Sequence, residues 1–437
     1  MKRYLGILLL LLLCQPTSAQ RRLTLRSCLE RGLEQNYQVQ IVRNEEQMAA
    51  NDATPANAGM LPSVDLTSNV GASLLSSDAK QRDGAKVNES ASFDQSAGIS
   101  VGVNWTIFEG MRLRTNLERL HQMKAMGEVQ TRQTIEEFIA SLTAEYYNFV
   151  QQNLRLENFR YAVQLSRERL RITEERFKIG SFSRLDLLQA RVDFNADSSK
   201  YMSQHELVVA SRIRINELMA EEDVNARISI RDTLISVNKA LVWERLVQDM
   251  ESRNAELLLA EHQTRVSELD LKMVKGAKYP YVTLSAGYGY NYNRFDKGSM
   301  KWKGTLGPDV GIRIGVPLFN PRSRRDERNA QLQIDNSRLL QQQIRQTLMA
   351  DLSTFWQAYR NNLELIELER DNLIAAKENY EIAMERYLLG DLPGIEMREA
   401  QKNLLDAEER ILAAQYNTKL CEISLQQISG NVSVYLQ

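Results

Sequence analysis

The sequence predicts a mainly α-helical protein that also carries transmembrane β-strands, and three observations lead to this fold class. The chain has 437 residues, yet it holds no proline between 63 and 279 or between 322 and 392. Proline breaks helices, so these stretches permit very long ones. Four other segments alternate between apolar and polar residues, as strands with two different faces do. The same order of helices and strands occurs twice, which indicates an internal duplication.

The chain opens with a pattern that is typical of a secretory signal peptide. Lys2 and Arg3 precede an apolar run over residues 5–13, and the small residues of a cleavage site follow at 17–19. We therefore expect residues 1–19 to be removed. A lipid on Cys14 is the alternative, and the bulky leucine before this cysteine disfavours it.

Composition excludes several classes of function. The net charge of -1 gives no basic surface for nucleic acid. After cleavage the chain keeps Cys28 and Cys421, whose places near opposite ends favour two separate thiols over a disulfide. We expect no enzyme, cofactor or metal site, because no phosphate loop or catalytic triad is present and the three histidines lie far apart. These histidines are His121, His205 and His262.

The first repeat, residues 20–219, is predicted to read helix, β-hairpin, long helix, tip and helix. Its hairpin covers residues 63–107, with strands at about 63–76 and 95–107. The polar link SDAKQRDGAKVNES, from Ser77, predicts an exposed loop. One face of the strands is apolar and the other is small or polar. The apolar face holds Val64, Leu66, Val70, Ala72, Leu74, Ala97, Ile99, Val101, Val103, Trp105 and Ile107.

A long helix follows from about Gly110 to Lys178. It would span about 100 Å at 1.5 Å per residue, and such length favours coiled-coil packing. Gly180 is suited to end it in a left-handed conformation. Ser183 and Asp186 then have the spacing of a capping box that starts the next helix. The apolar residues recur at helical steps, at Ile135, Phe138, Ile139, Leu142, Tyr146 and Phe149.

Residues 220–240 link this repeat to the second one, residues 241–430, and residues 431–437 form a C-terminal tail. The second hairpin covers residues 281–318, with a tip near residue 390. Its strands are predicted at about 281–295 and 305–318, joined by the loop DKGSMKWKG. The long helix that follows repeats the helical pattern at Leu352, Phe355, Trp356, Tyr359, Leu363 and Ile366.

The two predicted tips resemble each other closely. RFKIGSFSRLDLLQA, from Arg176, aligns with RYLLGDLPGIEMREA, from Arg386. Both carry an arginine, an aromatic residue, a glycine and then an acid six residues after the glycine. WTIFEGMRLR and VPLFNPRSRR, which end the two hairpins, match in the same way through Phe108 and Phe319.

The two-faced strands fit either a small soluble sheet or a transmembrane β-barrel. Their length favours the barrel, because a tilted spanning strand needs about 9–11 residues. Tyr288, Tyr290, Tyr292 and Trp105 supply rings suited to a membrane interface. Four strands cannot close a barrel, and unpaired strand edges are costly in lipid. Several copies must therefore share one barrel.

This arrangement resembles the TolC family of outer-membrane efflux and secretion channels, over nearly the whole mature chain. The resemblance implies a homotrimer with a twelve-stranded β-barrel in the outer membrane and an α-barrel of long helices in the periplasm, with residues 220–240 as its equatorial segment. It implies a passive conduit for small molecules or proteins. It also implies two partners at the helical tips, a periplasmic adaptor (membrane fusion) protein and an inner-membrane RND or ABC transporter.

The resemblance also assigns roles to residues at the tips. Arg176, Gly180, Arg386 and Gly390 would belong to the adaptor-docking ends, although helix capping explains the glycines as well. Acids at the matching offsets of the second tip close the periplasmic entrance in the family. Here these offsets hold Glu396 and Glu399, and Asp186 is their partial counterpart in the first tip. Leu392 occupies the place of the family's basic partner, so the latch of the closed state is undetermined.

Several interpretations stay open beside this one. The arginines after the hairpins would contact lipid headgroups or lie in solvated first helical turns. A periplasmic coiled-coil adaptor or structural protein would also have long helices, but its strands need not all have two faces. A trimeric adhesin would need one barrel segment and no duplication. The arginines are Arg112, Arg114, Arg322, Arg324 and Arg325.

Overall fold

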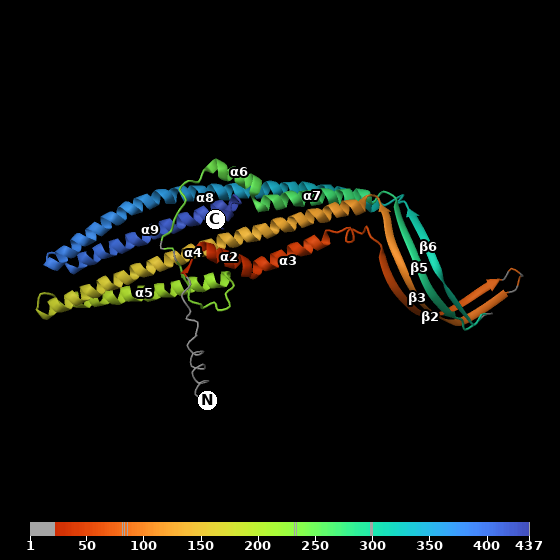
Figure 1. The fold of residues 1–437 in the computed structure, drawn as a ribbon, viewed down its shortest axis with the longest axis horizontal. Coiled ribbons are helices and arrows are strands. Elements are labelled where there is room, and N and C mark those ends of the chain that lie inside the picture. Colours follow the sequence, from red (N-terminus) through yellow and green to blue (C-terminus); the bar gives the residue numbers. More distant parts are fainter. Residues whose placement is uncertain are drawn as a thin grey trace, which may run out of the picture. The chain divides into compact units, whose positions relative to one another are not determined.

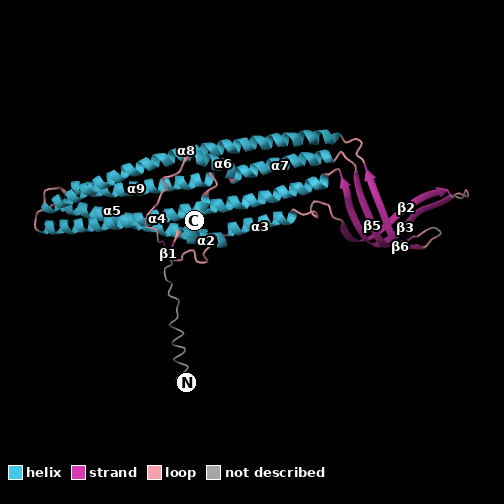
Figure 2. Ribbon diagram, turned by 45° about the horizontal axis from the view of Figure 1, so that its top comes forward, coloured by secondary structure: helices cyan, strands magenta, loops and turns pink. Residues whose placement is uncertain are grey.

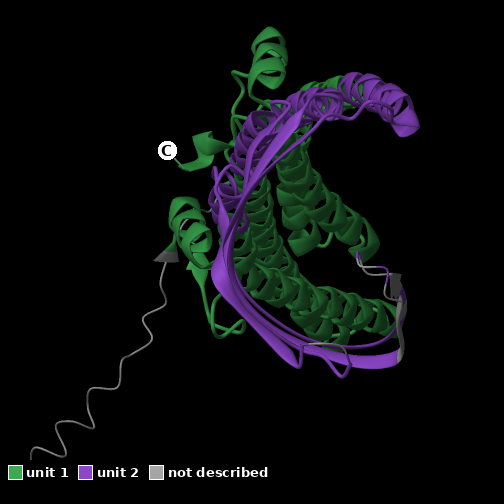
Figure 3. Cartoon of the chain, turned by 90° about the vertical axis from the view of Figure 1, so that its right-hand side faces the viewer, with its two compact units in different colours: residues 1–44, 130–258, 343–437 green, residues 45–129, 259–342 purple. Residues whose placement is uncertain are grey.

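The computed structural model describes residues 22–436 except 81, 83, 85, 231, 233, 298 and 299. The predicted signal peptide and Cys14 lie outside the described residues. Two compact units make up the chain (Figure 3). One unit holds the residues up to 44, residues 130–258 and those from 343 onward, and the other holds residues 45–129 and 259–342.

Long helices dominate the element order, as the sequence predicts. The helices are α2 (Leu25–Gln35), α3 (Tyr37–Asp52), α4 (Arg112–Lys178), α5 (Arg184–Leu218), α6 (Trp243–Arg253), α7 (Ala255–Gly276), α8 (Pro321–Leu389), α9 (Gly394–Ile428) and the short 3-10 helix η1 (Val432–Leu436). The strands are β1 (Arg22–Leu23), β2 (Ser63–Lys80), β3 (Lys86–Glu109), β4 (Ser229–Ile230), β5 (Tyr281–Arg294) and β6 (Trp302–Gly315).

Two helical hairpins make up most of the first unit, although the first turns of their long helices belong to the second. Helix α4 has 67 residues and turns back into α5, and α8 has 69 residues and turns back into α9. In each pair the two helices run side by side (Figures 1 and 2). Within the described residues, no helix is both long and apolar enough to cross a membrane.

The predicted apolar stripes of the long helices face the core. Leu142 and Tyr146 of α4 are fully buried in one cluster, and Leu352 and Tyr359 of α8 are buried in another. The remaining predicted stripe residues are buried or pack against these clusters. Cys28 and Cys421 are buried free thiols, and burial raises the pKa of Cys28 to about 12. These thiols are therefore protonated at neutral pH, and the chain carries them separately.

The second unit holds a four-stranded antiparallel sheet in the order β2-β3-β5-β6 (Figure 2). The prediction of four long strands is therefore confirmed, and the sheet joins the two hairpins through the β3–β5 pair. Gly110, directly after β3, has a φ of 54°. A Cβ there would lie 2.2 Å from the carbonyl oxygen of Gly276, so only glycine fits where β3 turns into α4.

The first hairpin is longer than predicted. Strand β2 continues to Lys80 and β3 begins at Lys86, so most of the predicted loop from Ser77 is strand. Backbone hydrogen bonds between the two strands hold this extension. Its residues are mostly polar, so the sequence shows no alternation of apolar and polar residues from which a strand could be predicted. Strand β6 is shifted toward the N-terminus, from Trp302 to Gly315. It ends two residues before Pro317, which cannot donate a backbone hydrogen bond.

One local prediction also needs correction. Strand β3 has a bulge at Ile107, so Phe108 pairs with Val282 and takes the place predicted for Ile107 in the apolar row. Residues 220–240, predicted as the linker between the repeats, contain the short strand β4, which pairs in parallel with β1. This pair is only two residues long on each side, too short to leave a pattern in the sequence.

Candidate functional site

The sheet carries an apolar face that none of the described residues covers. Residues paired across neighbouring strands form rows, and Val101 lies between Leu66 and Tyr288 in one of them. Strand β6 adds Val310 and Ile312, which pair with apolar residues of β5. Most side chains of this face are exposed, with Val310 at 74%, and the rest are half-buried. Such a continuous exposed apolar face marks a surface that contacts a partner or a membrane.

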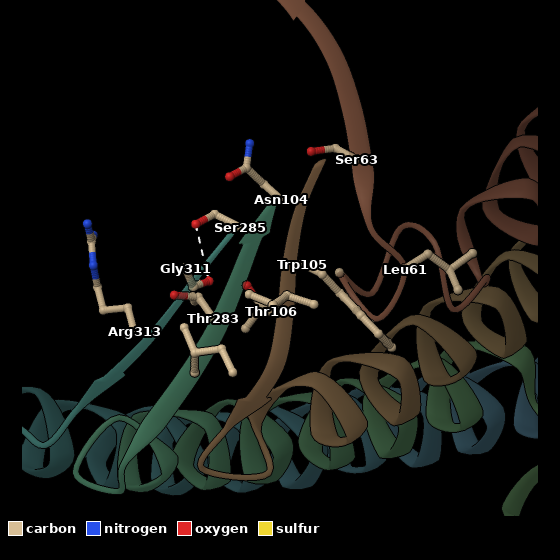
Figure 4. A pocket seen from close by; sticks show the side chains of 12 residues that line it. Leu61, Ser63, Asn104, Trp105, Thr106, Thr283, Ser285, Gly311 and Arg313 are labelled. Atoms are coloured by element: carbon tan, nitrogen blue, oxygen red, sulfur yellow. Dashed lines mark hydrogen bonds between the residues drawn. The ribbon is translucent and has the colours of Figure 1, made fainter. Parts of the chain in front are cut away.

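The opposite face is lined by small and polar side chains. Asn104 lies between Ser63 and Ser285 in one row, and Ser285 donates a hydrogen bond of 3.3 Å to the carbonyl oxygen of Gly311. Figure 4 shows Asn104 pointing away from Trp105, its neighbour in β3, whose ring nitrogen donates to the Met60 carbonyl oxygen at 2.9 Å. The predicted two-faced pattern is therefore confirmed across all four strands.

The end strands β2 and β6 each have only one neighbour in this sheet. Each therefore presents an outer edge of backbone N–H and C=O groups without a strand partner. Because successive strands are antiparallel and there are four of them, the two end strands run in opposite directions. Strand β6 of one copy could therefore continue the antiparallel order by pairing with β2 of another.

The first tip joins α4 to α5 through Gly180, whose φ of +82° lies in the left-handed region. Ser183 then caps α5 by the predicted capping box. Its hydroxyl accepts a hydrogen bond from the Asp186 backbone N–H at 3.2 Å, and the Asp186 carboxylate accepts one from the Ser183 backbone N–H at 3.0 Å. The Ser183 hydroxyl also donates to the Asp186 carboxylate at 2.7 Å, and this bond, together with the one from the Ser183 backbone N–H, lowers the pKa of Asp186. Asp186 is thus anionic, and its carboxylate is engaged in the capping box at the start of α5.

The second tip repeats this backbone geometry. Gly390 has a φ of +91°, and the Asp391 N–H bonds to the Arg386 carbonyl oxygen at 3.0 Å. The equivalent bond in the first tip runs from Ser181 to Arg176 at 2.9 Å.

Acids follow the second tip as the sequence indicates. Glu396 lies in the first turn of α9, and Glu399 lies one turn later. Both side chains are exposed. Among the described residues, no two of Asp186, Glu396 and Glu399 contact each other by a hydrogen bond, and Leu392 is buried beneath the tip.

Arg176 of the first tip contacts the second tip directly. Its guanidinium donates to the Leu388 carbonyl oxygen at 2.8 Å and lies over the rings of Phe182 and Tyr387, at 5.1 and 5.4 Å from their centroids. The Thr173 hydroxyl lies 3.1 Å from the Tyr387 hydroxyl. Arg386, its counterpart in the second repeat, is exposed, and its guanidinium has no hydrogen-bond partner within the described ranges. The two predicted docking arginines therefore differ in role.

Both tips expose aliphatic side chains at the same places. Ile179 and Leu389 immediately precede the tip glycines, and Leu185 and Ile395 follow five residues after them. All four are more than 70% exposed, between 74% and 79%. Large aliphatic groups with this exposure at a turn are candidates for contact with a partner. These residues were not predicted as contacts, although they stand at matching places in the two aligned tip segments.

A buried polar cluster above the tips was also missed. Arg398 of α9 donates two hydrogen bonds, of 2.6 and 2.7 Å, to the Asp197 carboxylate of α5. Ser166 of α4 also bonds to Asp197, and Gln401 of α9 donates to the Ser166 hydroxyl at 3.3 Å. Arg169 pairs with Asp193 beside them. This cluster, hereafter the clasp, joins the α4–α5 hairpin to α9.

Comparisons with known proteins agree with this geometry. The family model described as outer membrane efflux protein matches residues 28–221 and 246–431. The probable efflux pump outer membrane protein TtgC of Pseudomonas putida is 22% identical over 333 residues, which are 73% of this chain and 66% of that protein. This chain thus matches just under two thirds of the length of that relative.

Two further comparisons cover more of the molecule. Outer membrane protein TolC of Vibrio cholerae is 20% identical over 411 residues, 92% of this chain and 89% of that protein. The crystal structure of the outer membrane protein VceC from Vibrio cholerae has the same fold, with a TM-score of 0.75 and 16% identity over 93% of this chain and 96% of that one.

The matched family is one of efflux proteins and not of enzymes, and it covers most of the chain in two segments. The fold agrees with that of solved relatives from end to end. The family description also confirms the predicted location in the outer membrane. The chain therefore belongs to the outer membrane efflux protein family, and its resemblance to TolC-like channels is confirmed.

Proposed function

We propose that the protein is the outer-membrane channel of a tripartite efflux pump or type I secretion system. The observation that carries this proposal is the sheet with one bare apolar face, one polar face and two open edges. In a barrel the apolar face meets lipid and the polar face lines a wet lumen. Open edges are not tolerated in lipid, so copies must pair edge to edge.

The aromatic side chains support a membrane-spanning position. Phe108 of β3 pairs with Val282 at one end of the apolar face, and Tyr292 lies on the same face near the other end of β5, where its ring stacks on that of Trp302 with centroids 6.1 Å apart. The ten-residue step from Val282 to Tyr292 is about 33 Å along a strand. A strand tilted by about 45° would bring this to about 23 Å, close to the height of about 25 Å between the aromatic girdles of a barrel.

Three copies would complete the barrel. The smallest closed barrels have about eight strands, so four strands require at least two copies. The family resemblance favours a homotrimer with twelve strands. The opposite directions of β2 and β6 allow each copy to pair with the next in one closed ring.

The partners follow from the same resemblance. A periplasmic adaptor protein would dock at the tips, and an inner-membrane RND or ABC transporter would supply energy. Relatives are named as outer membrane components of toluene and antibiotic efflux pumps, which supports export of small molecules, with secreted proteins as the alternative cargo. Ile179, Leu185, Leu389 and Ile395 would be the apolar contacts of docking, beside the tip residues Arg176, Gly180, Arg386 and Gly390.

The periplasmic entrance would be ringed by acids. Glu396 and Glu399 are exposed on one side of α9 near the tip, and threefold symmetry would bring three copies of each toward one axis. Asp186 would add negative charge at the same end, although it already caps α5. Such a ring attracts cations to the mouth of the tunnel.

Fractionation with cross-linking tests the proposal against a periplasmic adaptor or structural protein. The expected result is recovery in the outer-membrane fraction, release only by detergent, and a cross-linked three-copy product. Release as a soluble protein by osmotic shock would instead support the adaptor-like alternative and refute the channel.

A further inference from the structure

A groove lies where the sheet of the second unit meets its helices. It has a volume of about 870 Å³ and is bounded by the end of α7, the segment between β6 and α8, and the first turn of α8. Helices α7 and α8 run side by side up to this point (Figures 1 and 2). The groove is therefore at the helix-side end of the strands, where a spanning sheet would leave the membrane core.

Two walls of the groove are apolar. Met273, Val274 and Ala277 of α7 contribute one wall, and Leu318 and Phe319 contribute the other. Leu318 is 94% exposed and Phe319 is 86% exposed, although both are large and apolar. Both residues follow β6 in the chain, shortly after its last residue, Gly315. A long hydrocarbon chain would cover both walls.

The rest of the groove is cationic, with Arg112, Lys278 and Arg324 in its lining. Arg324 is exposed and has no hydrogen-bond or ion-pair partner in the described part of the chain. The two lining carboxylates are already neutralised by other arginines. Asp270 pairs with Arg119 at 2.9 Å, and Asp326 pairs with Arg325 at 2.7 Å. Arg112 is paired with Glu109 and Lys278 with Glu327, so an anion in the groove would meet the free positive charge of Arg324.

Two polar atoms of the lining also lack a partner. The Ser323 hydroxyl and the Arg112 Nε are buried and make no hydrogen bond to any described residue. Buried polar groups are normally satisfied, so an orphaned donor in a groove wall indicates a ligand or water there. The first turns of α4 and α8 hold arginines and no acid, so they combine the positive helix end with cationic side chains. Phosphate is the common anion that suits such a place.

We propose that this groove binds a glycerophospholipid with an anionic headgroup. Its phosphate would lie near Arg324 and Ser323, and an acyl chain would cover Leu318 and Phe319. The proposal rests on the proposed outer-membrane insertion, because that insertion brings this end of the sheet to the headgroups of the inner leaflet. Such a resident lipid would anchor each copy of the channel at the periplasmic side of the membrane.

The test uses the full assembled protein in detergent, mixed with equal amounts of phosphatidylglycerol and phosphatidylcholine of the same acyl chains. Native mass spectrometry counts the lipids retained per copy. Arg324→Gln is compared with Arg328→Gln, which removes the same charge one turn further along α8, outside the groove. Wild type and Arg328→Gln should prefer phosphatidylglycerol. Arg324→Gln should retain about fivefold less of it, since one basic residue near an anionic surface is worth about that factor.

Three results would overturn the proposal. One is equal retention of phosphatidylglycerol by both variants. Another is its displacement by inorganic phosphate at the same concentration, which would make the site a phosphate site. The third is that Phe319→Ser splits the assembly while lipid per copy stays constant, which would make the groove a contact between copies. Flotation with vesicles distinguishes failure of the lipid site from failure of the proposed channel. If the wild type floats with the vesicles but shows no lipid preference, only the lipid site is refuted. If the wild type does not float, the channel is refuted.

Discussion

Asp197 and Arg398, which are 201 residues apart, form a two-bonded ion pair between α5 and α9, with N–O distances of 2.6 and 2.7 Å. The Asp197 side chain is almost fully buried, and its hydrogen bonds to Arg398 are the main cause of the raised pKa of that guanidinium. The Arg398 guanidinium therefore stays charged at any physiological pH. It holds the hairpin of the first repeat to the returning helix of the second, directly above the tips.

Breaking this pair should destabilise the first unit strongly. Arg398→Met leaves the buried Asp197 charge with only Ser166 as a partner, and uncompensated buried charges cost about 3–5 kcal/mol. Hydrogen exchange should rise in α5 and α9 around the clasp, and the thermal midpoint should fall. Arg370→Met, which breaks the exposed pair with Glu367, is the matched control and should shift the midpoint far less. Equal shifts in both variants would show that the clasp has no special role.

Substitutions on the two faces of the sheet should differ in effect. Val101→Arg or Ile312→Arg puts a charge on the face proposed to meet lipid, at a cost of about 2–4 kcal/mol near the membrane centre. Less protein should then reach the outer membrane, as measured by immunoblot of the membrane fraction. Asn104→Gln, on the polar face of β3, should insert normally. Similar losses for all three would mean that the faces are assigned wrongly.

The tip glycines should be required for docking. Gly180→Trp and Gly390→Trp place a bulky side chain at φ angles of +82° and +91°, which only glycine adopts readily. Export and co-purification of the adaptor should fall while the assembled protein still reaches the membrane. Ile179→Ser with Leu389→Ser removes the apolar contacts without backbone strain and should weaken adaptor binding too. Unchanged binding in both sets would leave the tips with a capping role only.

The acids after the second tip should control ion selectivity. Glu396→Gln with Glu399→Gln removes the charge and nearly preserves the shape. In planar bilayers the double variant should lose cation preference and become less sensitive to block by multivalent cations from the periplasmic side. The difference should shrink as salt rises, because screening weakens it. Wild-type selectivity at low salt would show these residues to be ordinary solvated carboxylates.

Sequence patterns predicted those parts of the fold in which one residue and its near neighbours decide the structure. Alternation placed Val101 and Asn104 on opposite faces, and Gly180 with Ser183 marked a tip, because these features need no knowledge of distant segments. The extension of the first hairpin to Lys80 could not be predicted, since polar residues on both faces form the same backbone ladder without a pattern.

The clasp could not be predicted from the sequence for a different reason. A helix of 35 residues drifts in phase relative to a coiled-coil repeat, so the sequence alone does not fix which side of α5 or α9 faces inward near Asp197 and Arg398. An acid and an arginine in separate helices also look like ordinary solvated residues until the packing places them together. The groove beside Arg324 likewise depends on how α7 and α8 meet, and the sequence offered only its arginines.

Cross-linking between strand edges tests the shared barrel most directly. A cysteine at Thr67 in β2 is combined with one at position 305, 307 or 309 in β6, and the buried native thiols serve as the background control. Within one chain these edges are separated by two strands, about 14 Å, too far for a disulfide. Oxidation in membranes should therefore link copies, with one β6 position giving a covalent ladder that stops at three. If every pair stays monomeric on oxidation while the protein is in the outer membrane, the four strands do not share a barrel and the central claim is wrong.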